Sequence, residues 1–239
     1  MAFLDIHTHI LPGVDDGAKD VKESLELLDM LRKQGVNNVC LTPHFDASYD
    51  NIEDFEKVVD KSYQKLKRAM EGKDLPKVFL GAEVLYFPGI GKSEEIKRLC
   101  LENTHYLLLE FGQVSFDNMV CDDIINLKDE IGVMPIIAHF ERYKKLKLYK
   151  NLLGIIANGD AIGQINAGSL LTKPYKRQAL KLLKYDLVGL VGSDAHSVEE
   201  RPPQIKAALD IIADRFGGSE SNRLIKNSEY ILTRMGGGK

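Results

Sequence analysis

The chain has 239 residues, of which 44% are apolar and 28% are charged, an ordinary composition for a globular protein with a sizeable core. Its 32 basic and 35 acidic residues give a formal net charge of −3, which offers no electrostatic reason to expect binding to nucleic acid or to an anionic membrane. Three cysteines without close spacing predict neither a disulfide framework nor a cysteine metal site. No apolar run approaches the roughly 18 residues of a membrane-spanning helix. The first predicted strand begins too close to Met1 for a signal peptide, so we expect a cytoplasmic protein.

Short apolar runs alternate along the chain with longer segments whose apolar residues recur at helical spacing. In the first half these patterns predict strands at residues 3–7, 38–42, 78–84 and 106–111, and helices at 19–35, 51–72 and 94–101. In the second half they predict strands at 134–138, 161–166 and 187–192, and helices at 120–131, 145–158, 175–184, 203–216 and 220–235. The final GGGK is predicted to be a disordered tail.

Seven units of a strand followed by a helix favour an α/β fold with a parallel sheet and helical crossovers. Several of the strands are apolar throughout, which is typical of strands covered on both faces. A closed barrel and an open, doubly wound sheet both fit this order. The chain contains no linker, low-complexity segment or internal repeat, so residues 1–239 are predicted to form one domain.

Metal-ligating residue types follow six of the seven predicted strands. The sequence DIHTH places His7 and His9 on the same side of an extended chain, where the first strand ends. The full set of candidate ligands is His7, His9, Asp16, His44, Glu83, Glu110, His139, Asp194 and His196. Only the sixth strand, in QINAGS, contributes no charged ligand. His105 is the one histidine outside the pattern, and we interpret it as a residue of a helix-to-strand turn.

The carboxyl ends of parallel barrel strands are where active sites are assembled. Carboxylates and imidazoles beside buried apolar residues are costly unless they are paired, hydrogen-bonded or bound to a cation. Nine candidates exceed the three or so protein ligands of one catalytic ion, so two or three ions are predicted. Nitrogen and oxygen ligands without thiolates favour manganese, iron or zinc.

Two arginines follow the candidate ligands closely. Arg142 lies three residues after His139, and Arg201 lies five residues after His196. Guanidinium groups bind phosphate oxygens with a fixed, forked geometry. Beside a cluster of metal ions, Arg142 and Arg201 are therefore candidate catalytic residues that hold a phosphate.

With these motifs in place, the chain resembles the polymerase-and-histidinol-phosphatase (PHP) superfamily of metal-dependent phosphoesterases. Within it, the chain is similar to the protein-tyrosine phosphatases of bacterial capsular and exopolysaccharide gene clusters. The motifs that carry the resemblance, between residues 4 and about 227, are DIHTHILPGVDDG, TPH, GAEV, LLLEF, PIIAHFERY, QINAGSL and GSDAHS followed by RPP.

The resemblance implies a distorted seven-stranded (β/α)7 TIM-like barrel with three metal ions, usually manganese. Its first ion would be held by His7, His9, Glu83 and Asp194, its second by Glu83, Glu110 and His139, and its third by Asp16, His44 and His196. It assigns phosphate binding to Arg142 and Arg201. Many superfamily members have histidine where this chain has Asp16 and Glu110, and this carboxylate version is typical of the tyrosine phosphatases.

The resemblance further implies hydrolysis of phosphotyrosine in a protein, such as the tail of a membrane-associated bacterial tyrosine kinase that controls polysaccharide synthesis. Two alternatives remain open: a small-molecule phosphatase such as one acting on histidinol phosphate, and a non-catalytic module that binds a kinase tail. A TatD-like nuclease would also begin with HxH, but GAEV replaces the GEIGLD of those enzymes. A cysteine-dependent phosphatase is excluded, because no cysteine has an arginine six residues later.

Overall fold

The computed structural model describes residues 3–112, 118–147 and 149–236. Within them the strands are β1 (Leu4–Asp5), β2 (Asn38–Leu41), β3 (His44–Phe45), β4 (Lys77–Leu80), β5 (Glu83–Leu85), β6 (Tyr106–Glu110), β7 (Met134–Ile137), β8 (Ile162–Asn166) and β9 (Leu190–Gly192). The α-helices are α1 (Val21–Lys33), α2 (Ile52–Met70), α3 (Asn118–Asp129), α4 (Tyr149–Ala157), α5 (Ala167–Leu171), α6 (Lys176–Lys184), α7 (Ile205–Phe216) and α8 (Gly218–Met235). The 3₁₀ helices are η1 (Ile90–Lys92), η2 (Glu94–Leu99) and η3 (Phe140–Lys145).

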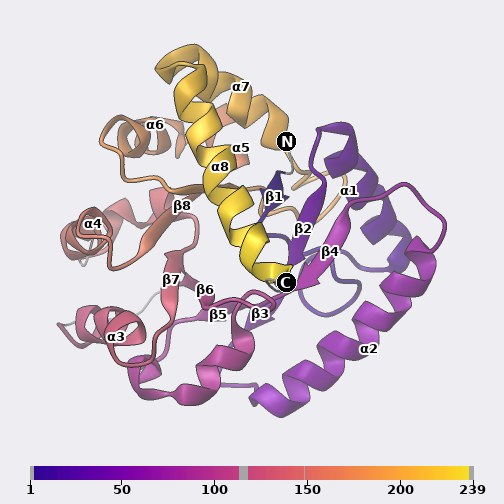
Figure 1. The fold of residues 1–239 in the computed structure, drawn as a ribbon, viewed down its shortest axis with the longest axis horizontal. Helices are drawn as coiled ribbons and strands as arrows, with labels where there is room; N and C mark the ends of the chain where they lie inside the picture. The colour runs from indigo at the N-terminus through magenta and orange to yellow at the C-terminus, as the bar shows by residue number, and fades with distance from the viewer. Residues whose placement is uncertain (1–2, 113–117, 148, 237–239) are drawn as a thin grey trace.

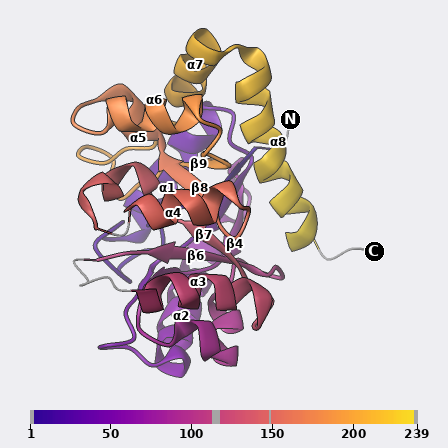
Figure 2. The same cartoon turned by 90° about the vertical axis from the view of Figure 1, so that its left-hand side faces the viewer.

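All strand pairs are parallel, in the orders β1-β2-β4 and β3-β5-β6-β7-β8-β9. The helices lie around the outside of the strands, except α8, which crosses one end of them (Figures 1 and 2). The alternation of strands and helices, the α/β class and the parallel pairing are confirmed. The sheet is curled, as expected for strands that each turn slightly relative to the last.

The predicted count of seven strands is not confirmed, because the described residues form nine strand segments. The predicted strand at 78–84 is divided into β4 and β5, which pair in different sheets. Beside it, β2 is followed after two residues by β3. Backbone hydrogen bonds span this break, from Gly81 N to Leu41 O (3.0 Å) and from Glu83 N to Pro43 O (3.0 Å).

Three predicted helices differ from the structure. The segment at 94–101 is the 3₁₀ helix η2, and the helix predicted at 145–158 is replaced by η3 followed by α4. Residue 148 of that prediction and residues 237–239 of the predicted disordered tail lie outside the described residues. The last helix begins at Gly218, earlier than predicted. Caps explain the well-predicted starts of α1 and α2, where the side chains of Asp20 and Asn51 accept hydrogen bonds from the first turn.

Two apolar clusters cover the two faces of the strands. Alternate strand residues such as Leu4, Ile6, Leu108 and Leu190 form an inner cluster, while their neighbours pack outward against the helices. Helix α8 closes the inner cluster at the amino ends of the strands, where it contributes Ile231 and Met235. The opposite, carboxyl ends of the strands are therefore left for polar residues. No helix among the described residues is long and apolar enough to cross a membrane.

Candidate metal centre

The carboxyl ends of the strands bring all nine candidate ligands into one connected cluster. They come from the residues after β1, from the loop before α1, from β3, β5 and β6, and from the residues after β7 and β9. The cluster contains three overlapping groups of donor atoms within 4.8 Å of one another: His9, Asp16, His44 and His196; His7, His9 and Asp194; and His44, Glu83 and Glu110. The predicted convergence is thus present in the structure.

Glu83 lies at the centre of the cluster and is 1% exposed. Its Oε2 lies 3.1 Å from His7 Nε2 and 3.0 Å from His9 Nε2. The same oxygen lies 3.3 Å from His44 Nδ1, and the other oxygen lies 3.1 Å from His139 Nε2. One buried carboxylate therefore faces four imidazoles, which is the position a bridging metal ligand would take.

The remaining carboxylates complete the cluster at its edges. Asp194 Oδ1 lies 3.5 Å from His7 Nε2, and Glu110 Oε2 lies 3.1 Å from His139 Nε2. Asp16 Oδ1 lies 3.4 Å from the Nε2 atoms of both His44 and His196. The side chains of Asp16 and His44 are 65% and 39% exposed, so the cluster extends from a buried floor to an open rim.

Strand geometry determines the direction in which the side chains of His7 and His9 point. His7 and His9 point the same way because Thr8 between them pairs with Ala195 in a parallel bridge beyond β9. Two glycines leave room for this arrangement. A Cβ at Gly17 would lie 1.9 Å from His9 O, and one at Gly192 would lie 2.8 Å from His7 Cβ.

His139 and Asp194 both have left-handed backbones, with φ of 32° and 54°. Residues other than glycine rarely adopt this conformation, which costs about 1–3 kcal/mol and is concentrated at functional sites. His139 lies two residues after the end of β7, and Asp194 lies two residues after the end of β9. The turn at each of these points directs the side chain into the cluster. Two of the four non-glycine residues with this backbone in the described part of the chain, His139 and Asp194, therefore lie at the candidate site, while Asn103 and Asp186 lie elsewhere.

In His7 and His9, a hydrogen bond to the ring nitrogen that faces away from the cluster, Nδ1, fixes the ring so that Nε2 faces the cluster. His7 Nδ1 lies 3.2 Å from Gln164 Oε1, and His9 Nδ1 lies 2.7 Å from Asp15 Oδ2. Because both partners accept, each Nδ1 donates, so the Nε2 atom has a lone pair once its own proton is lost. Yet the two Nε2 atoms lie only 3.2 Å apart, against the Glu83 carboxylate. Lone pairs and carboxylate oxygens that converge in this way fit a divalent cation.

The titration of the histidines indicates the same demand for positive charge. Burial lowers the pKa of His9, but hydrogen bonds to Asp15 and Glu83 outweigh it and raise the pKa to about 10. Burial also lowers the pKa of His139, but the hydrogen bonds of this ring to Glu110 and Glu83 outweigh burial and raise the pKa to about 9. Protons or metal ions must supply the charge that these carboxylates require.

His196 differs from the other histidines. Burial and repulsion by His9 lower its pKa to about 4, so the ring is neutral at pH 7. Its Nδ1 donates to Asp194 O at 2.9 Å, and its Nε2 is buried without a hydrogen-bond partner among the described residues. A neutral imidazole with a free, oriented Nε2 is the form that binds a metal ion.

Both predicted arginines reach the cluster. The Nη2 atoms of Arg142 and Arg201 each lie 2.8 Å from Asp194 Oδ2. Burial opposes ionisation of Asp194, but attraction to His7 above all, and then to His9 and Arg201, lowers the pKa of its carboxyl. Arg142 comes from η3 and Arg201 from the loop after β9, and their side chains are 33% and 40% exposed, so their remaining N–H groups can reach a ligand at the rim.

Sequence reasoning missed two residues that orient the cluster. Gln164 Oε1 accepts from His139 N at 2.9 Å, and Gln164 Nε2 donates to Asn166, which donates to Asp194 Oδ2. These residues belong to β8, the strand predicted to contribute no charged ligand. Two polar side chains two positions apart in a buried strand were the available signal. Asp15 stands beside Asp16 in the motif DIHTHILPGVDDG, but only the structure separates their roles: Asp15 bonds to His9, whereas Asp16 lies against His44.

Comparisons with known proteins agree over nearly the whole chain. A sequence profile for the family described as capsular polysaccharide synthesis, CpsB/CapC, matches residues 3–233. The tyrosine-protein phosphatase CpsB of Streptococcus agalactiae is 31% identical over 240 residues, which cover 96% of this chain and 98% of that protein. The tyrosine-protein phosphatase YwqE of Bacillus subtilis is 30% identical and covers 96% and 91%.

A solved structure gives the same result for the fold. It is described as YwqE from Bacillus subtilis and CpsB from Streptococcus pneumoniae, unique metal-dependent tyrosine phosphatases, and matches with a TM-score of 0.85 at 29% identity over 97% of this chain and 94% of that one. A histidinol phosphate phosphatase from Lactococcus lactis matches with a TM-score of 0.52 at 14% identity, covering 95% and 93%. The latter likeness concerns the fold alone.

Proposed function

The chain belongs to the CpsB/CapC family of capsular polysaccharide synthesis proteins, and on that premise we propose that it is a metal-dependent protein-tyrosine phosphatase. The observation that carries this proposal is the joint placement of nine metal-ligating residues and two arginines at one end of the strands. The relatives named CpsB and YwqE are tyrosine-protein phosphatases, and the solved structure is described as metal-dependent.

We propose that the cluster holds two to three divalent ions. Three ligand sets fit the geometry: His7, His9, Glu83 and Asp194; Glu83, Glu110 and His139; and Asp16, His44 and His196. Glu83 would be shared, because its two oxygens face different histidines. The all-nitrogen-and-oxygen donor set suits manganese, with iron or zinc as alternatives.

The ions would supply an activated water at neutral pH and Lewis-acid stabilisation of phosphoryl charge. Arg142 and Arg201 would bind the phosphoryl oxygens, because each has N–H groups beyond the one used by Asp194 and lies at the rim. Asn166 and the two arginines all donate hydrogen bonds to Asp194 Oδ2 and hold that carboxylate in place. In phosphoryl transfer such positioning and charge stabilisation account for most of the catalysis.

The open rim favours a phosphate carried on a long, rigid side chain. His44 and Asp16 are exposed while His7 and His9 are fully buried, so phosphate must travel inward from the surface. The phenyl ring of phosphotyrosine provides that reach, whereas phosphoserine would force the peptide backbone against the loops. We propose a tyrosine-phosphorylated protein as substrate, with the tail of a membrane-associated bacterial tyrosine kinase in polysaccharide synthesis as the expected partner.

We further propose that the strands form a single distorted seven-position barrel within one domain. Counting β2 with β3 and β4 with β5 as broken strands gives seven positions. Hydrogen bonds from His9 N to Ala195 O (2.9 Å) and from Asp194 N to His7 O (2.9 Å) connect the first position to the last, which favours closure. Three unpaired cysteines, Cys40, Cys100 and Cys121, fit a reducing compartment, so we propose a cytoplasmic location.

Turnover on defined substrates tests the function. We expect the manganese-loaded protein to hydrolyse a phosphotyrosine peptide with a higher kcat/KM than a phosphoserine peptide or histidinol phosphate. Chelation should abolish turnover, whereas alkylation of cysteines should not act through a catalytic thiol. Faster hydrolysis of histidinol phosphate would assign a small-molecule phosphatase. Binding of the phosphopeptide without any turnover would assign a non-catalytic module.

A further inference from the structure

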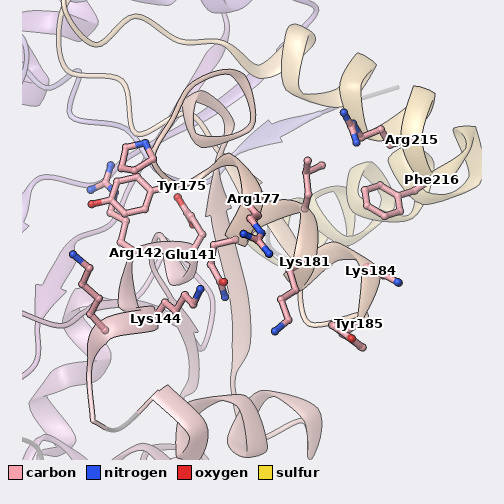
Figure 3. Close-up of a pocket in the computed structure, with 14 residues that line it drawn as sticks. Glu141, Arg142, Lys144, Tyr175, Arg177, Lys181, Lys184, Tyr185, Arg215 and Phe216 are labelled. Atoms are coloured by element: carbon pink, nitrogen blue, oxygen red, sulfur yellow. The ribbon is translucent and has the colours of Figure 1, made fainter.

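A large cavity lies beside the metal centre. It is bordered by η3, by α6 together with the residues just before it, and by the end of α7. Its volume is about 850 Å³, within the range of roughly 300–1,000 Å³ that is usual for ligand sites. Figure 3 places Arg142 and Tyr175 at one end of it, Arg177 and Lys181 in the middle, and Arg215 and Phe216 toward the other end. We call this cavity the basic groove.

The basic groove concentrates positive charge on a chain whose net charge is −3. Its basic residues are Arg142, Lys144, Lys145, Arg177, Lys181, Lys184 and Arg215. Apart from Arg142, all of them are exposed, and none of these forms an ion pair with any residue that the structure describes. Some surface cations elsewhere are paired, as Lys206 is with Asp210 and Lys57 with Asp54, but what distinguishes the groove is that seven basic residues line one cavity. The groove thus presents unneutralised charge in a concave surface.

Glu141, the one acid in the lining, does not neutralise the groove. It is 1% exposed, and its Oε1 accepts hydrogen bonds from Ser169 Oγ (2.5 Å) and Asn166 N (3.3 Å). Its role is internal, whereas the cations point to solvent.

Arg142 connects the basic groove to the metal centre. Its Nη2 lies 2.8 Å from Asp194 Oδ2 in the cluster, and the same side chain lines the groove. A peptide whose phosphate is held at the cluster can therefore continue directly along the groove. Tyr175 and Tyr185, 38% and 60% exposed, provide aromatic surface along that path.

We propose that the basic groove is a substrate subsite that binds an acidic segment flanking the phosphotyrosine. This inference rests on the proposed function, because it takes a phosphotyrosine peptide as the ligand. Carboxylates spaced along an extended peptide match a row of cations that form no ion pairs within the described part of the chain. A peptide fits better than a membrane, because the charges line a concavity with aromatic walls rather than a flat or convex face.

The test compares peptides that differ only in their flanks. Each carries one phosphotyrosine with four glutamates or four glutamines placed before or after it, and each is also made with a non-hydrolysable phosphonate in place of the phosphate. Binding of the phosphonates to manganese-loaded protein is measured by fluorescence anisotropy, and kcat and KM are measured with the phosphopeptides. Exposed charge pairs of this kind predict about three- to tenfold tighter binding and lower KM for one glutamate flank. The preference should shrink in high salt.

Matched variants locate the effect. Arg177→Gln/Lys181→Gln removes two charges one helical turn apart on α6, and Lys61→Gln/Lys65→Gln removes two exposed charges with the same spacing on α2. We expect the preference for glutamate flanks to disappear in the α6 variant and to persist in the α2 variant. Circular dichroism and melting curves confirm that both fold.

Three results would overturn the basic groove as a peptide subsite. They are equal binding of the glutamate and glutamine phosphonates, survival of the preference in the α6 variant, and full displacement of the glutamate peptide by phosphatidylglycerol vesicles. A glutamate preference in binding without hydrolysis of any phosphopeptide would instead contradict the proposed function and leave the groove assignment standing. The experiment therefore distinguishes failure of the groove assignment from failure of the proposed function.

Discussion

The two ends of the curled sheet are built from the same strands but have opposite characters. At the amino ends, α8 places Ile231 and Met235 against the inner apolar cluster, and His105 lies exposed before β6. At the carboxyl ends, buried histidines and carboxylates converge into one cluster. The comparison indicates that one end stabilises the fold while the other carries a costly arrangement for function.

The largest expected effect separates the two ends through their histidines. His139→Ala should reduce kcat/KM by more than about 100-fold, because even losing an outer partner of a metal ligand costs about 10–100-fold. His105→Ala should leave kcat/KM nearly unchanged, since His105 is on the other end and contacts only Tyr106 and a backbone bond to Met134 among the interactions described. Equal losses in two folded variants, judged by circular dichroism, would contradict the difference between the ends.

A smaller effect is expected from Arg201→Lys at the rim. Lysine keeps the charge but loses the forked geometry that reaches Asp194 and a phosphate together. Loss of one charge-assisted hydrogen bond, about 1.5–3 kcal/mol, corresponds to roughly tenfold or more in kcat/KM. Steady-state kinetics with a phosphotyrosine peptide at saturating manganese measure this, and wild-type kinetics in the variant would remove Arg201 from the site.

The amino end should respond in stability rather than in activity. Ile231→Ala removes a side chain that is 2% exposed and is expected to lower the free energy of unfolding by about 2–4 kcal/mol. Lys226→Ala, at an exposed position of the same helix, should change it by less than about 0.5 kcal/mol. Denaturant titration gives both values. Activity per folded molecule should be retained in Ile231→Ala, and its loss would mean that α8 also shapes the metal centre.

The pH dependence should differ with and without metal. The raised pKa values of His9 and His139 contribute stability to the metal-free protein that is fully present below the unfolded pKa near 6.5, and this contribution is lost as pH rises through about 9 to 10. Metal must displace these protons, so its affinity should fall as pH decreases, by up to about tenfold per pH unit for each proton released. Melting curves and metal titrations at pH 6.5 and 8.5 measure both trends. A metal affinity independent of pH would contradict the assignment of these histidines as ligands.

Most strands and helices could be predicted because the apolar periodicity of long segments is a strong signal. The short elements could not be predicted, because no period can be recognised in so few residues. They are β3, which has two residues, and η3 and α5, which are one turn or little more. The division of 78–84 into β4 and β5 depends on pairing with β2 and β3, which is a long-range contact. Tertiary structure decides such cases, not local propensity.

The candidate ligands could be predicted because strand ends concentrate residue types that a core would exclude. The supporting amides could not, since Gln164 and Asn166 carry no charge and their partners lie far away in sequence, as His7 and Asp194 do. The basic groove was also missed. Its cations come from η3, α6 and α7, and only the fold brings Lys144, Arg177 and Arg215 to one surface.

Elemental analysis of the metal-reconstituted protein tests the central claim most directly, because the claim is that nine residues from six strand ends form one multinuclear centre. The protein should be stripped of metal, reconstituted with manganese, freed of excess ion and analysed against protein concentration. We expect two to three ions per chain. At most one ion per chain in protein that is folded and fully reconstituted would contradict the multinuclear centre and, with it, the proposed ligand sets.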